Sequence, residues 1–161
     1  MTSPGTAGEG GAAWGHRTSR PFLIIGALGV VGGGLVSAGT AGSPSYHASW
    51  AVAYLVLVVG VAQIALGVAQ ASLTRGTVPG RVVAGEAVSW NLGNALVLLG
   101  TLAGTPALLY VGAVLLVVAL LLFAVAIRRG RRGVLLAATW ALIVILLISM
   151  PVGVVIQAVA G

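Results

Sequence analysis

Five unbroken apolar blocks, each about 20 residues long, constrain this chain more than any other feature of its sequence. Each block can cross the roughly 30 Å of hydrocarbon in a bilayer, because a helix rises about 1.5 Å per residue. The strands of a membrane β-barrel would instead alternate apolar and polar residues. The sequence therefore predicts an all-α integral membrane protein, a bundle of about five transmembrane helices. The predicted spans are 21–41, 49–73, 82–103, 107–127 and 134–158.

Composition excludes an ordinary soluble domain and most catalytic sites. Of the 161 residues 59% are hydrophobic and only 6% are charged, against about a quarter charged in soluble proteins. The chain has no cysteine, so disulfides and cysteine metal sites are excluded. Two acidic residues and two histidines are too few for a Ser–His–Asp triad, an HExxH zinc site or paired catalytic carboxylates. We therefore expect a protein that is not an enzyme and that holds no cofactor or metal.

The positive charges of the chain are placed as topological signals. All eight basic residues are arginines that lie just outside the apolar blocks. Two lie in residues 1–20, two in the 74–81 loop and four in the 128–133 loop, whereas the two intervening loops hold none. This alternation predicts a cell-membrane protein with a cytoplasmic N-terminus and an extracytoplasmic C-terminus. Because the charges serve topology, nucleic acid is not an expected partner.

The two ends of the chain leave alternatives open. Residues 1–20 are small, polar and glycine-rich, which predicts a disordered cytoplasmic tail. The first block also has features of a signal peptide, because Arg17 and Arg20 precede an apolar stretch that ends in small residues. Pro151 interrupts the hydrogen bonding of the fifth block, so that helix either continues with a kink to about 158 or ends near Met150.

The third block is the weakest of the predicted spans. The fourth block has fourteen Leu, Ile, Val and Phe residues, which contribute about −4 to −8 kcal/mol to insertion. The third has nine, worth about −3 to −5 kcal/mol, and it also carries Glu86, Asn91 and Asn94. A charge at mid-membrane costs about 2.5 to 3.5 kcal/mol. We therefore expect the third block to insert as a tight hairpin with the fourth, joined at residues 104–106.

Polar residues at matching depths mark the second and third blocks. Glu86 lies about one turn inside the third block, where it is close enough to the interface to snorkel or to pair with Arg81 or Arg75. In two antiparallel helices Gln70 and Glu86 fall at one level, and Gln63 and Asn94 fall at a deeper one. The candidate transport residues are Glu86, Asn94, Gln63 and Gln70.

Two functions compete for these polar residues. Hydrogen bonds between helices contribute about 0.6 to 2 kcal/mol each and are common in membrane bundles. On this interpretation the chain is a small accessory or scaffold subunit that is not an enzyme. The alternative is a small transporter or channel for protons, cations or a small solute, built on the polar face between the second and third spans.

Two further patterns point to partners. Gly29, Gly33 and Ser37 have the four-residue spacing that lets helix backbones approach closely, which predicts a homo-oligomer or contact with an unknown membrane-protein partner. The loop RRGRRG is interpreted first as a topogenic turn. Its arginines are also expected to contact membrane lipid through anionic headgroups, at about 1 kcal/mol each. These residues are Arg128, Arg129, Arg131 and Arg132.

Overall fold

Helices account for nearly all of the chain that the structure describes. The structure, a computed structural model, describes residues 9–74, 76–130 and 132–160. In order, the elements are α1 (Glu9–Thr40), α2 (Tyr46–Tyr54), the π-helical stretch η1 (Leu55–Ala62), α3 (Gln63–Leu73), α4 (Gly80–Leu102), α5 (Pro106–Ile127) and α6 (Val134–Ala160). Because α2, η1 and α3 follow one another without a break, five long helices result, each long and apolar enough to cross a bilayer. The predicted all-α class with five candidate spans is confirmed for the described residues.

Helix α1 begins earlier than the predicted first block, and α6 follows the longer of the two alternatives left open for the fifth block. Helix α1 begins at Glu9, so residues 9–20 of the predicted disordered tail are helical, while residues 1–8 lie outside the described residues. Extending an existing helix costs no new nucleation, which accounts for this longer N-terminal part. At the other end α6 continues through Pro151 to Ala160, because a single missing hydrogen bond need not end a helix.

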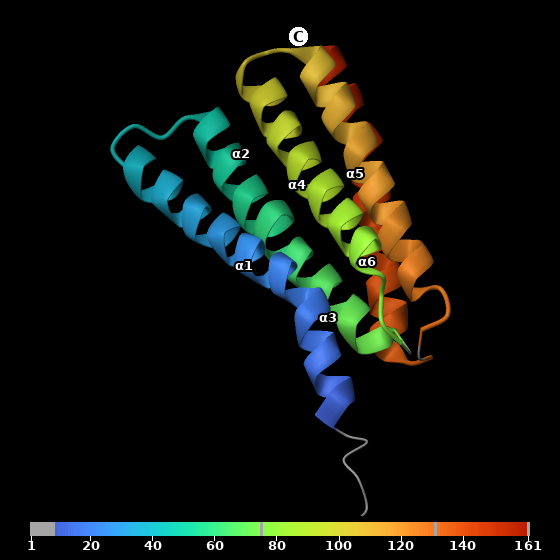
Figure 1. The fold of residues 1–161 in the computed structure, drawn as a ribbon. Helices are drawn as coiled ribbons and strands as arrows, with labels where there is room; N and C mark the ends of the chain where they lie inside the picture. The colour runs from blue at the N-terminus through green and yellow to red at the C-terminus, as the bar shows by residue number, and fades with distance from the viewer. Residues whose placement is uncertain (1–8, 75, 131, 161) are drawn as a thin grey trace, which may run out of the picture.

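Two antiparallel helix pairs form the bundle, and α6 packs beside them. Helix α1 lies along η1 and α3, and α4 lies along α5. Figure 1 shows the two pairs converging toward the loops 74–79 and 128–133 and diverging toward the turns 41–45 and 103–105. We call the first the arginine end, after the arginines in and beside its loops. We call the second the aromatic end, because the aromatic residues of α2 begin there.

Glycines bring α4 and α5 into backbone contact. A Cβ added to Gly112 would lie 2.7 Å from the carbonyl oxygen of Gly93 and 2.8 Å from the backbone nitrogen of Val97. Near the turn, a Cβ on Gly100 would lie 2.6 Å from the nitrogen of Leu109. The turn itself passes through Gly104, whose φ of +61° favours glycine. The predicted α4–α5 hairpin is therefore present, and its role in membrane insertion stays a prediction.

A second glycine face holds α1 against η1. A Cβ on Gly26 would lie 2.9 Å from the carbonyl oxygen of Gly60, and one on Gly29 would lie 3.2 Å from the nitrogen of Gly60. A Cβ added to Gly33 would lie 2.6 Å from Cγ2 of the Val56 side chain. Ser37 is exposed and lies outside this contact. Gly29 and Gly33, two of the three residues that the sequence marks for self-association, are thus covered within the chain by η1, and self-association stays a prediction.

Aromatic rings join both helix pairs at the core. Phe123 of α5 lies 5.2 Å from the ring of Phe22 in α1 and 6.4 Å from that of Trp90 in α4, measured between ring centroids. All three side chains are buried, and Ile143 of α6 closes the same cluster. Signal-peptide cleavage, the alternative that the sequence left open, would remove Phe22 from this core.

The close α4–α5 approach predicts a strong difference between two glycine substitutions. Gly112→Ala places a methyl group against backbone atoms and should cost about 1 to 3 kcal/mol of stability, as overpacking usually does. Gly85→Ala, on α4 where it faces Leu122 of α5, is the matched control, since its Cβ would lie 3.6 Å from Leu122 Cδ1. Thermal unfolding in detergent should separate the two variants, and equal midpoints would contradict the packing described here.

Candidate functional site

A buried carboxylate lies against a buried amide where α3 faces α4. The Gln70 Nε2 group donates to both carboxylate oxygens of Glu86, at 2.8 Å to Oε1 and 2.9 Å to Oε2. Both side chains are fully buried. The sequence placed Gln70 and Glu86 at the same depth, and in the structure their side chains are in direct contact. Within the described residues Glu86 forms no ion pair; Arg81 is exposed to solvent, and Arg75 lies outside the described residues.

Further along α4, Asn94 is fixed from two sides. Its amide Nδ2 donates to the backbone carbonyl of Trp90 at 2.8 Å, and its Oδ1 accepts a hydrogen bond of 2.8 Å from the hydroxyl of Tyr54. Glu86, Trp90 and Asn94 recur every four residues and so lie on one face of α4. The sequence had matched Asn94 with Gln63 in depth, whereas the hydrogen-bond partner in the structure is Tyr54.

The π-helical stretch η1 explains why Tyr54 faces α4. In an α-helix, nine steps of 100° would put Tyr54 on the side opposite to Gln63. A π-helix advances only about 80° per residue, so nine steps make about two full turns and return Tyr54 to the face of Gln63. Gln63 and Gln70 already share that face because they are seven residues apart. No signal in the sequence marks the π-helical stretch, which is why sequence reasoning missed Tyr54 as a site residue.

Several buried polar atoms of this face have no hydrogen-bond partner among the described residues. The Nε2 and Oε1 atoms of Gln63 lack a partner, and so do Gln70 Oε1 and the indole Nε1 of Trp90. Gln63, Gln70 and Trp90 are all fully buried. An unpaired buried polar group costs about 1 to 3 kcal/mol, so each of these atoms is a candidate contact for a water molecule or an ion. We call the set Glu86, Gln70, Gln63, Trp90, Asn94 and Tyr54 the polar file.

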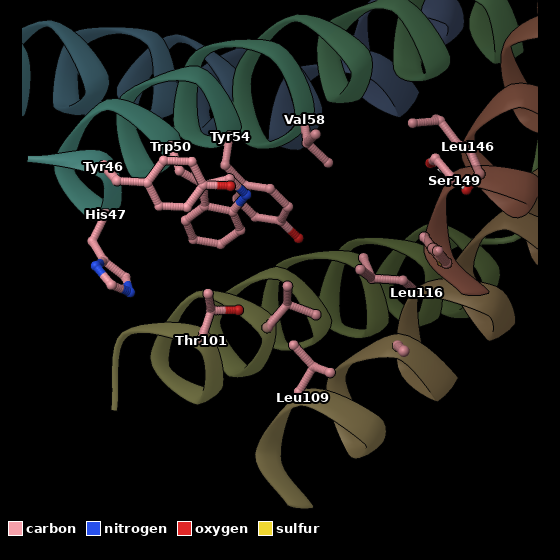
Figure 2. A pocket seen from close by; sticks show the side chains of 13 residues that line it. Tyr46, His47, Trp50, Tyr54, Val58, Thr101, Leu109, Leu116, Leu146 and Ser149 are labelled. Carbon is pink, nitrogen blue, oxygen red and sulfur yellow. Dashed lines mark hydrogen bonds between the residues drawn. The ribbon is translucent and has the colours of Figure 1, made fainter. Parts of the chain in front are cut away.

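A cavity of about 370 Å³ adjoins the polar file at the aromatic end. Tyr54 belongs to both, since it lines the cavity and binds Asn94. Figure 2 shows Trp50 and Tyr54 reaching from α2 toward the helix that carries Thr101, and Tyr46 lines the same cavity. The rings of Trp50 and Tyr54 stack with centroids 5.1 Å apart. The cavity thus has aromatic and apolar walls and a polar hydroxyl at the point where the file begins.

The remaining predicted residues lie away from the polar file. Gly29 and Gly33 belong to the α1–η1 contact, and Ser37 is exposed. Arg128, Arg129 and Arg132 are exposed at the arginine end, and Arg131 lies outside the described residues. Among the residues that the structure describes, no three His, Cys, Asp or Glu side chains come together as metal ligands.

Comparison of the chain with protein families, with curated proteins and with solved structures finds no match.

The Gln70–Glu86 contact predicts energetic coupling between the two positions. Removing one partner leaves the other buried without its hydrogen bond, so Gln70→Leu and Glu86→Leu should each destabilise the protein. The double variant should be more stable than the sum of the two losses indicates, by about 0.6 to 2 kcal/mol. Unfolding of the four proteins in mixed detergent micelles measures this coupling.

Asn91 provides the control for this comparison of single and double variants. Its amide donates to the carbonyl of Ala87 within α4, at 2.8 Å, and not to α3. Asn91→Leu combined with Gln70→Leu should therefore be additive. Additive behaviour of the Gln70–Glu86 pair as well would show that the contact contributes nothing specific.

Proposed function

We propose that the chain is a multi-pass protein of the cell membrane, with the arginine end in the cytoplasm and the aromatic end outside. Five apolar helices and large outward-facing side chains support embedding, for example Leu35, which is 69% exposed. Gathering the arginine-bearing loops at one end supports the orientation, because positive residues are retained on the cytoplasmic side. Tyr46, Trp50 and Tyr110 at the opposite end fit an interfacial aromatic belt.

Within that frame the polar file is a path for protons or small monovalent cations between the external cavity and Glu86. The single observation that carries this proposal is Gln63, which is fully buried with neither amide atom hydrogen-bonded. An amide that served only to hold helices together would have a partner on a neighbouring helix. Unpaired groups at this depth are instead suited to water or an ion that passes between helices.

The ordering of groups along the file supports the same function. The cavity at the aromatic end leads to the Tyr54 hydroxyl and the Asn94 amide. Glu86 lies eight residues from Asn94 on α4, about 12 Å farther toward the cytoplasmic end. Gln63 and the indole of Trp90 provide unpaired polar atoms in the intervening part of the bundle. A buried carboxylate at the inner end is the group that would accept a proton or neutralise a cation.

An accessory subunit is the second candidate function. The observation in its favour is the cavity between the diverging helix pairs, whose walls include Val58, Leu109 and Leu116. A helix of a partner membrane protein would bury these apolar side chains. Co-purification of one stoichiometric partner, together with no flux through the isolated protein, would favour this function over transport.

Reconstitution into liposomes tests the transport proposal. Under an imposed potential, the wild-type protein should move protons or a monovalent cation, read by an internal pH dye and by isotope uptake. Glu86→Gln should lower that flux by at least about tenfold, because an amide can still accept a hydrogen bond from Gln70 but carries no charge. Asn91→Leu, which changes an amide outside the file, should leave the flux unchanged.

Gln63→Leu gives a signature that a structural role would not produce. The substitution removes two unpaired buried atoms, so the protein should become more stable while the flux falls. A protein that loses stability and keeps its flux would contradict the proposal, as would a wild-type protein with no flux.

A further inference from the structure

We propose that the arginine end carries a binding site for one anionic phospholipid, between the 74–79 loop and the end of α5. This proposal rests on the membrane embedding proposed above and does not depend on transport. A hollow of about 600 Å³ opens there, between the loop, the first turn of α4 and the C-terminal part of α5. Its lining includes Arg129, Pro79, Val82, Leu122 and Val125.

The charge around the hollow is positive and uncompensated within the described residues. Arg129 lines the hollow, and Arg81 and Arg128 each precede a lining residue in the sequence. Glu86, the acidic residue whose side chain the structure describes, is buried and bonded to Gln70, so it does not neutralise these arginines. Helix α4 adds to the positive field, because its N-terminus opens here and Pro79 gives it no side-chain cap.

The apolar walls select an amphiphile over a free anion. Leu122 and Val125 lie three residues apart on α5, and Arg129 lies in the turn that directly follows the helix, so the lining leads from the guanidinium to the apolar side chains of α5. Val125 is 56% exposed in this lining. A phospholipid whose phosphate binds Arg129 would place an acyl chain along Val125 and Leu122, with Val82 of α4 on the other side of the chain.

The backbone around Arg129 is held in place. Gly130 packs against α3, where an added Cβ would lie 3.2 Å from Leu73 Cβ and 3.3 Å from the carbonyl oxygen of Leu73. Its nitrogen donates to the carbonyl of Ile127 at 2.7 Å. Arg129 therefore starts from a fixed backbone position beside the 74–79 loop, whereas Arg132 is exposed and is not part of the lining. This difference separates a built site from a merely basic surface.

Native mass spectrometry of the full chain in detergent, titrated with phosphatidylglycerol and with phosphatidylcholine, tests the site. The wild-type protein should retain one phosphatidylglycerol in preference to phosphatidylcholine. Arg129→Gln should weaken phosphatidylglycerol binding about fivefold, the effect expected for one arginine at an anionic surface. Arg132→Gln removes the same charge from the same loop and should leave the affinity unchanged. Arg129→Lys should restore most of it.

Two further measurements distinguish a bound phospholipid from a free phosphate ion. Ala126→Trp should fill the hollow and reduce phosphatidylglycerol binding while leaving the arginines intact. Inorganic phosphate at millimolar concentration should displace little lipid, because it lacks an acyl chain. Equal losses in Arg129→Gln and Arg132→Gln would overturn the site in favour of a diffuse basic surface. Complete displacement by phosphate, with no effect of Ala126→Trp, would overturn the lipid in favour of a free anion. Both readouts are independent of flux, so failure of transport leaves them intact.

Discussion

Enclosing a carboxylate among apolar helices is the constraint around which this bundle is organised. Glu86 is fully buried, and its two oxygens are met by one amide, that of Gln70 on the neighbouring helix. A buried charged or polar group is costly unless it is hydrogen-bonded, so α3 and α4 must keep one register for this contact to exist. The same register leaves Gln63 buried without a partner. The structure therefore satisfies the carboxylate and leaves the Gln63 amide unpaired among the described residues, which is the physical basis for proposing transport.

Two backbone features make this register possible. Glycines at the α4–α5 and α1–η1 contacts let the two helices of each pair approach closely along their backbones. The π-helical stretch then rotates the first part of the second long helix relative to the rest, which brings Tyr54 onto the face that carries Gln63 and Gln70. The helix pairs meet at the aromatic core around Phe123 and diverge toward the aromatic end, where the cavity lies.

The sequence predicted the parts of this fold that depend on hydrophobicity and helical phase. Block length predicted five long helices, and seven-residue spacing put Gln63 and Gln70 on one face opposite the face of Glu86. It could not predict the Tyr54–Asn94 bond, because a π-helical stretch rich in valine and leucine has no distinctive composition. It marked Gly29, Gly33 and Ser37 for self-association and did not predict the contact of Gly26, Gly29 and Gly33 within the chain, because 25 glycines offer many equivalent spacings. Tertiary contacts choose among those spacings.

Transport along the polar file requires that water reach Gln63 from the aromatic end. Because the chain has no cysteine, a single thiol can be introduced by Gln63→Cys and compared with Val61→Cys, whose side chain is 50% exposed on the outside of the bundle. A small, permanently charged thiol reagent is applied to membranes from either side, and the rate at which each thiol reacts is measured. We expect the thiol at position 63 to react from the aromatic end at least about tenfold faster than the thiol at position 61, since lipid excludes a charged reagent. A thiol at position 63 that reacts no faster than the lipid-facing control would contradict transport along the polar file.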